Sequence, residues 1–126
     1  MIPMTEVYRI EAIKIMTKML KYSKFEYERY EKTRNEIYLQ QAGEKLFNAY
    51  SKYLEIKFSK RTQNHDDTRK LAYHDEYDTN IMSNLDHLHE YFYHGGDVFS
   101  TNQYYTSALK KVEDAITIYN KTGIAY

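Results

Sequence analysis

Residues that break helices are nearly absent from this chain. Its 126 residues include one proline, Pro3, and four glycines, of which only Gly43 lies between residues 4 and 94. Because proline and glycine are the strongest terminators of helices, their absence over long stretches favours long helices. Apolar residues recur every three or four positions along these stretches, and no strand-like alternation accompanies them. The sequence therefore predicts an all-α protein.

The first two helices are expected in the N-terminal half. Thr5 has the side chain of an N-cap, and the helix after it extends into the charged, tyrosine-rich segment 24–36. Its expected apolar face consists of Val7, Ile10, Ile13, Met16 or Met19, Leu20 and Tyr27. The second helix covers roughly residues 35–60. Its main apolar stripe consists of Leu39, Ala42, Leu46, Ala49, Tyr50, Tyr53 and Ile56.

The polar connection 60–78 is expected to be the longest irregular segment, with one short helix capped by Asp66 or Asp67. Thr79 is the expected cap of a third main helix, which ends at Gly95. Its inward face consists of Ile81, Leu85, Leu88 and Phe92. A last helix follows Ser100 or Thr101, with an inward face of Tyr105, Ala108, Leu109, Val112, Ile116 and Tyr119. These patterns predict one domain, residues 1–126, folded as an up-and-down bundle of four main helices.

A second apolar stripe on the helix at 35–60 consists of Phe47, Leu54 and Phe58. A helix that is apolar over so wide an arc is either central to the bundle or shared with another subunit. The chain also has 15 tyrosines, whose rings suit half-buried faces and interfaces. Exposed apolar patches usually mark partner surfaces, so we expect a symmetric homodimer through Phe47, Leu54 and Phe58.

Charge and composition limit the classes of function. The 18 Lys and Arg residues balance the 18 Asp and Glu residues, so only a local patch could attract nucleic acid. There is no cysteine, so a metal would need histidine and carboxylate ligands. No apolar run approaches membrane-spanning length, no signal peptide is recognisable, and no phosphate-binding glycine loop is present. We expect a cytoplasmic protein that uses neither a cofactor nor a membrane.

Three of the five histidines lie in the segment HLHEYFYHGG, residues 87–96. His89 borders the apolar face of the third main helix, so it is expected to be buried and hydrogen-bonded. Together with Tyr93, one turn later, it is assigned a structural role. His87 and His94 belong to the opposite face and are expected to be exposed. Their spacing spreads them over two turns, which is unfavourable for a shared metal ion, and no metal site is predicted.

The remaining histidines, His65 and His74, are each followed by aspartate in the polar connection. The pairs resemble the His-Asp ligands of the HD metal-dependent phosphohydrolases, although those ligands lie at wider spacing. Capping and solvation explain the aspartates more simply.

Basic residues offer a candidate phosphate-binding patch. Lys14, Lys18 and Lys21 form a strip along the first helix. Residues expected near this strip are Lys57, Lys60, Arg61, Arg69 and Lys70. Of these, Lys60, Arg61 and Lys70 are the candidate binding residues, since cations in a connecting segment can contact phosphate groups.

Two segments resemble a known family. YLQQAGEKLFNAY, residues 38–50, is followed about forty residues later by LHEYFY, residues 88–93. Together they resemble the archaeal PaREP-type proteins of the HEPN group of helical bundles, over about the last two thirds of the chain. The positions that carry the first pattern are Gln41, Ala42, Glu44, Lys45, Leu46 and Phe47, and those of the second are Leu88, His89, Phe92 and Tyr93.

The resemblance implies dimeric modules associated with nucleotides, toxins or metal-independent RNA cleavage. Catalytic HEPN members carry an arginine and a histidine separated by four to six residues, and Arg69 and His74, with four residues between them, satisfy the shortest spacing. In such a pair the guanidinium would hold the scissile phosphate and the imidazole would transfer the proton of the 2′-hydroxyl. Lys70 follows Arg69 where active members favour a small polar residue.

Three classes of function therefore remain open. The first is a non-enzymatic dimeric module that binds nucleotide, RNA or a protein partner. The second is a metal-independent ribonuclease with Arg69 and His74 as catalytic residues. The third is a metal-dependent phosphohydrolase. RNA cleavage in the presence of a chelator distinguishes the second class from the first.

Overall fold

The structure of the chain is a computed structural model that describes residues 1–94 and 98–125, with the side chains of residues 91–94 excepted. Five helices occupy most of the described residues: α1 (Glu6–Thr33), α2 (Glu36–Phe58), α3 (His65–Ala72), α4 (Glu76–His94) and α5 (Val98–Thr122). Two short strands, β1 (Ile2–Pro3) and β2 (Lys60–Arg61), pair in antiparallel orientation. The all-α prediction is confirmed, including a short extra helix in the middle of the chain.

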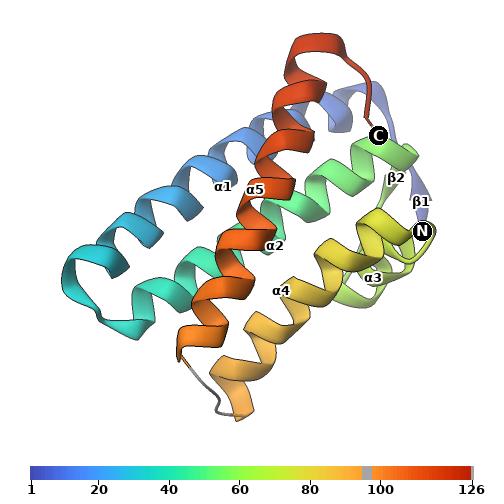
Figure 1. Ribbon diagram of the computed structural model, residues 1–126. Coiled ribbons are helices and arrows are strands. Elements are labelled where there is room, and N and C mark those ends of the chain that lie inside the picture. Colours follow the sequence, from blue (N-terminus) through green and yellow to red (C-terminus); the bar gives the residue numbers. More distant parts are fainter. Residues whose placement is uncertain (95–97, 126) are drawn as a thin grey trace.

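The helices form two antiparallel pairs, α1 with α2 and α4 with α5, and α3 lies beside the beginning of α4 (Figure 1). Helix α2 packs against α1, α3, α4 and α5. It is therefore central to the bundle, which explains its wide apolar arc without a second subunit. None of the helices in the described part of the chain has the length and apolar composition that a membrane crossing requires.

Side-chain caps fix the start of both long N-terminal helices. The Thr5 hydroxyl accepts a hydrogen bond from the Tyr8 amide, as the sequence predicted, and Asn35 caps α2 through the Ile37 amide. The same helices end at Arg34 and Ser59, which adopt left-handed backbone conformations with φ of 57° and 54°. The tight end at Arg34 lets α2 turn back directly along α1, and the one at Ser59 leads into β2.

The segment 60–78, predicted as the longest irregular segment with one short helix, contains that helix but is more ordered than predicted. It contains β2, α3 and the first turn of α4, which leaves only short connections. Asn64 caps α3 by accepting from the Asp67 amide, so Asp66 and Asp67 lie within the first turn. Carboxylates in the first turn are stabilised by the positive end of the helix dipole. Asp66 and Asp67 therefore stabilise the start of α3 without being its N-cap.

Two later helices begin earlier than predicted. Helix α4 begins at Glu76, where Asp75 caps the Asp78 amide, so Thr79 lies inside the helix. Helix α5 begins at Val98, ahead of the predicted caps Ser100 and Thr101. The predicted stop at Gly95 lies outside the described residues.

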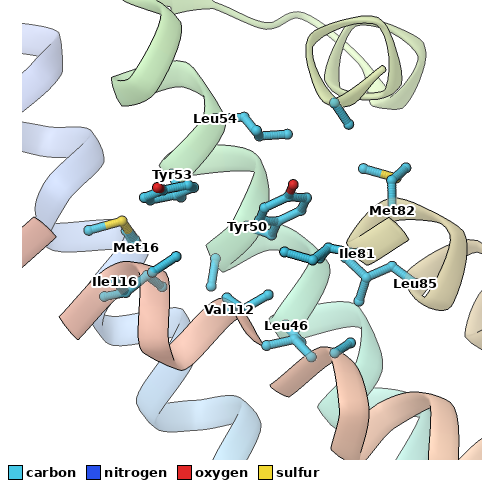
Figure 2. Close-up of a cluster of buried hydrophobic side chains, with 14 of the residues drawn as sticks. Met16, Leu46, Tyr50, Tyr53, Leu54, Ile81, Met82, Leu85, Val112 and Ile116 are labelled. Carbon is cyan, nitrogen blue, oxygen red and sulfur yellow. The ribbon is translucent and has the colours of Figure 1, made fainter. Parts of the chain in front are cut away.

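The core lies between α2 and the helices around it (Figure 2). The tyrosine rings of Tyr50 and Tyr53 are fully buried, together with aliphatic and methionine side chains from the other helices. Labelled neighbours in this cluster are Met16, Leu46, Leu54, Ile81, Met82, Leu85, Val112 and Ile116. Part of the high tyrosine content is thus explained by large rings that fill the core.

The predicted apolar face of α1 is partly wrong. Val7 is 82% exposed and Ile10 is 49% exposed, whereas Ala12, Met16 and Ser23 are completely buried. Small residues at 12 and 23 allow α1 to approach its neighbours closely. The Ser23 hydroxyl also donates to the Ala42 carbonyl of α2 at 2.7 Å. The buried face of α1 therefore combines small and polar residues with apolar ones such as Met16, and apolar spacing alone does not identify it.

Two buried carboxylates, Glu55 and Asp78, connect neighbouring elements of the bundle. Glu55 accepts hydrogen bonds from Tyr8 at 2.9 Å and from the Thr62 amide at 2.7 Å, and pairs with Lys52 at 2.9 Å. It thereby connects α2 to α1 and to the segment after β2. Asp78 plays the same part at the start of α4, where it accepts from Tyr50 at 2.7 Å and pairs with Lys57. Fully satisfied buried groups of this kind specify how elements pack.

Candidate functional site

A cavity of about 190 Å³ opens where α2, α3 and α4 meet. Helix α2 contributes Gln40, Gly43, Glu44, Phe47 and Asn48. Helix α3 contributes His65 and Arg69, and α4 contributes Leu85, Asp86, Leu88 and His89. The cavity therefore combines an aromatic ring, two imidazoles, a guanidinium, two carboxylates and two amides on an aliphatic base.

Helical spacing separates the floor of this cavity from its rim. Gly43, Leu85 and Leu88 are buried and form an apolar floor. Gln40, Glu44 and Asn48 recur every four residues along α2, so their side chains follow one edge of the cavity.

Arg69 is held by carboxylates rather than left free in the cavity. Its guanidinium pairs with Asp86 of α4 at 3.0 Å and with Asp66, one turn earlier on α3, at 3.3 Å. The hydrogen bond to Asp86 raises the pKa of Arg69 above its ordinary value, so the group stays charged. The positive charge is thus largely neutralised before any ligand binds, and the pair joins α3 to α4.

One wall of the cavity is aromatic. The ring of Phe47 lies 4.5 Å from the imidazole of His65, measured between ring centroids, with the planes inclined at 52°. His65 is the first residue of α3, so the N-terminus of that helix carries the imidazole across to α2. Such a pair offers π faces and edges to a planar ligand.

The prediction that His89 is buried is wrong, because its side chain is exposed at the cavity rim. Leu85 and Leu88, on the same face of α4, are buried as predicted. Helix α3 packs on α4 but has only eight residues, so it cannot cover the whole length of that face. The cavity lies where this cover stops.

The other two histidines of the cluster divide between described and undescribed parts. His87 is exposed, as predicted, and its ring stacks on Tyr104 at 4.5 Å between centroids with the planes 12° apart. The side chains of Tyr93 and His94 lie outside the described residues.

The predicted catalytic partners Arg69 and His74 take different environments. Arg69 faces the cavity and Asp86, whereas His74 follows the end of α3 and packs against Phe58, 5.4 Å away between ring centroids. Arg69 instead shares the cavity with His65 and His89. Helix α3 produces this arrangement because it turns Arg69 toward α4 and ends before His74.

The basic candidates lie elsewhere on the surface. Lys60 and Arg61 are exposed on β2, and the Arg61 guanidinium lies 4.3 Å from the centre of the Tyr8 ring. Lys70 is exposed on α3 and does not line the cavity. Lys57, expected in the same patch, pairs with Asp75 and Asp78 and is therefore neutralised.

The predicted dimer interface of Phe47, Leu54 and Phe58 is wrong at Leu54, because this side chain is completely buried within the chain. Phe47 and Phe58 are only partly exposed, and each packs against a histidine ring, His65 and His74 respectively. The apolar surplus of α2 is thus largely used inside the chain. Apart from Ile37 at the start of α2, the large exposed apolar side chains lie on other elements, above all on α1.

Sequence reasoning missed Gln40, Asn48 and Asp86 as site residues, and it named Glu44 only through the family resemblance. The four-residue spacing of Gln40, Glu44 and Asn48 was visible, but such spacing also describes any solvated helix face. Among the described residues, no three histidine, aspartate or glutamate side chains are grouped in a way that could hold a metal ion. Comparisons of the chain with models of known families, with curated proteins and with solved structures found no match.

Proposed function

We propose that the chain is a HEPN-like helical module that binds a nucleotide or single-stranded RNA in the cavity between α2, α3 and α4, without cleaving it. The observation that carries this proposal is the lining of the cavity: the aromatic pair Phe47 and His65 lies beside the amides and carboxylate of the α2 rim. Proteins recognise unpaired bases by stacking on aromatic rings combined with hydrogen bonds to the base edge.

The positions of the family resemblance add a second support. Glu44 and Phe47 belong to the first resembling segment, and Leu88 and His89 belong to the second. All four line the cavity, although about forty residues separate the two segments. A shared binding site gives these two patterns a common reason to occur together.

The state of Arg69 favours binding over catalysis. A general base must lie within hydrogen-bonding reach of the group it activates, and a phosphate-clamping arginine needs free donors. Here Arg69 is engaged by Asp86 and Asp66, and His74 packs on Phe58 outside the cavity. This arrangement supports a non-catalytic module more than a ribonuclease that uses the Arg69 and His74 pair.

The test measures binding and cleavage in one sample. A fluorescent single-stranded RNA of mixed sequence is titrated with protein in chelator, followed by anisotropy and then by gel electrophoresis. We expect saturable binding, weakened about fivefold or more in Phe47→Ala, and intact RNA. Loss of contact with an aromatic platform costs about 1 to 3 kcal/mol per base, which accounts for this magnitude.

Cleavage in chelator that is lost in both Arg69→Ala and His74→Ala would replace this proposal with the ribonuclease. Cleavage that appears only after a divalent cation is added would favour the metal-dependent phosphohydrolase. Thermal melting of each variant separates loss of a site from loss of the fold.

We further propose that the module is a symmetric homodimer, now through the exposed face of α1 rather than through the α2 stripe. Val7 and Phe25 are 82% and 55% exposed, and Ile10 and Tyr22 lie on the same side of the helix. The four side chains form two pairs along this side of α1, and apolar side chains that gather on one face commonly mark partner surfaces.

Sedimentation is expected to give a dimer at micromolar concentration, because removing these apolar side chains from water lowers the free energy of the associated state. The double variant Val7→Glu/Phe25→Glu should be monomeric with unchanged helical content. Ile118→Glu, which alters an exposed isoleucine of α5, should remain dimeric. A monomeric wild type, or equal disruption by both variants, contradicts this interface.

A further inference from the structure

We propose that the cavity accepts a single nucleobase and prefers bases that carry an exocyclic amino group, such as cytosine and adenine, over their oxo counterparts. This inference rests on the proposed function and specifies the chemistry of its ligand. It follows from the size, the charge and the unpaired polar groups of the cavity.

The size of the cavity admits one ring system. Its volume of about 190 Å³ is smaller than the roughly 300 to 1,000 Å³ of pockets that enclose drug-sized ligands. A base could therefore rest on the floor of Gly43, Leu85 and Leu88, with its sugar and phosphate left at the opening. The face of the base would stack on the aromatic wall of Phe47 and His65, as in the proposed function, so that one edge of the ring would meet this floor.

The charge of the cavity disfavours a phosphate as the buried group. Its lining contains the carboxylates of Glu44 and Asp86 against one guanidinium, that of Arg69. That guanidinium already pairs with Asp86 and also with Asp66. An anion in the cavity would meet uncompensated negative charge from Glu44, whereas a hydrogen-bond donor would be attracted to it.

The polar groups available to a ligand lie along one edge. Among the described residues, Glu44, Gln40 and Asn48 have no side-chain hydrogen bond within the chain. The Glu44 carboxylate accepts only, so it suits an exocyclic amine, and the amides can donate to the adjacent ring nitrogen. Carboxylates pair with the cytosine amino group, and Asn or Gln pairs with adenine, in nucleic-acid recognition generally.

The oxo bases would bind less well at the same edge. Uracil presents a carbonyl oxygen where cytosine presents an amino group, so an acceptor would face the Glu44 carboxylate. An unpaired or repelled polar contact of this kind usually costs more than a good contact contributes. The preference therefore depends on Glu44 more than on any other residue of the rim.

The experiment compares ligands that differ at this group alone. Amide resonances of the protein are followed by NMR while cytidine or uridine is added, and separately adenosine or inosine. We expect cytidine and adenosine to bind about tenfold more tightly than uridine and inosine, in line with the discrimination of a single base-edge contact. Glu44→Gln should reduce that ratio to about two or less, whereas Glu28→Gln, an exposed glutamate on α1, should preserve it.

Equal affinities within each ligand pair, or a ratio unchanged in Glu44→Gln, would overturn the inference. Displacement of cytidine by inorganic phosphate would also overturn the inference, because it would indicate an anion site. Tighter binding of butylammonium than of cytidine would overturn it as well, because it would indicate a simple cation site. If RNA still binds in these cases, the proposed function stands without this selectivity. If neither nucleosides nor RNA bind, both proposals fail.

Discussion

Replacing Glu55 with alanine is expected to lower the free energy of unfolding by about 3 to 5 kcal/mol, the usual cost of removing one partner from a buried ion pair. The Glu55 side chain is completely buried. Its loss would leave the Lys52 ammonium, the Tyr8 hydroxyl and the Thr62 amide without their shared acceptor. Chemical denaturation followed by circular dichroism measures the effect.

The matched control is Glu44→Ala, which removes the same group from an exposed position of the same helix. That change should alter stability by less than about 0.5 kcal/mol, as is usual for surface substitutions. A Glu55→Ala loss no larger than that of the control would mean that Glu55 does not hold β2 and α1 against α2.

Replacing Lys57 with methionine is expected to cost about 3 kcal/mol or more at pH 7, because it leaves the carboxylate of Asp78 buried without its cation. Burial lowers the pKa of Lys57, but the hydrogen bonds to Asp78 and Asp75 outweigh it, so the pKa is raised overall. The contribution of Lys57 is therefore present at neutral pH and is lost only as the pH rises through this elevated value.

Asp78 should make the stability of the Lys57→Met variant depend on pH. Burial raises the pKa of Asp78 above its ordinary value, although Lys57 and Tyr50 hydrogen-bond to the carboxylate. A carboxyl group whose pKa is raised by folding binds its proton more tightly in the folded state, so lowering the pH relieves the cost of burial. Without Lys57 this relief should grow, and Lys57→Met should recover part of its lost stability between pH 7 and pH 5.

Asp75 gives the free energy of unfolding the opposite dependence on pH from Asp78. Burial raises the pKa of Asp75, but hydrogen bonds from the Asp78 amide and Lys57 outweigh it and lower the pKa overall. Its stabilising contribution is present above its ordinary pKa and disappears as the pH falls through the lowered value.

Two further variants separate these effects. Lys60→Met, at an exposed position nearby in the sequence, should change little at either pH. The double variant Lys57→Met/Asp78→Asn should be less pH-dependent than Lys57→Met alone. A Lys57→Met loss that is constant from pH 7 to pH 5 would contradict this account of Asp78.

The sequence predicted the all-α class and the start of the first helix because these signals are local, although the starts of α4 and α5 were predicted too late. The scarcity of proline and glycine predicted long helices, and the Thr5 cap predicted the start of α1. Local signals failed where tertiary packing decides. Val7 and Ile10 match a helical apolar pattern but are exposed, because the small side chains of Ala12 and Ser23 allow the opposite face to approach its neighbours.

The cavity could not be predicted in the same way, since it depends on where a short helix ends. Helix α3 directs Arg69 to Asp86 of α4 and places His65 against Phe47 of α2. These partners are distant in the sequence, and a spacing rule such as that of Arg69 and His74 contains no information about them. The length of α3 also leaves His89 uncovered, which reversed its predicted burial.

The most direct test of the central claim is the map of amide NMR shifts when a cytidine-rich single-stranded RNA binds in the presence of chelator. We predict that the largest shifts fall in residues 40–48, 65–69 and 85–89, which line the cavity, and that the RNA is recovered intact. Largest shifts in the lysine strip 14–21, in β2 or around His74, or cleavage of the RNA during the titration, would contradict a binding module centred on this cavity.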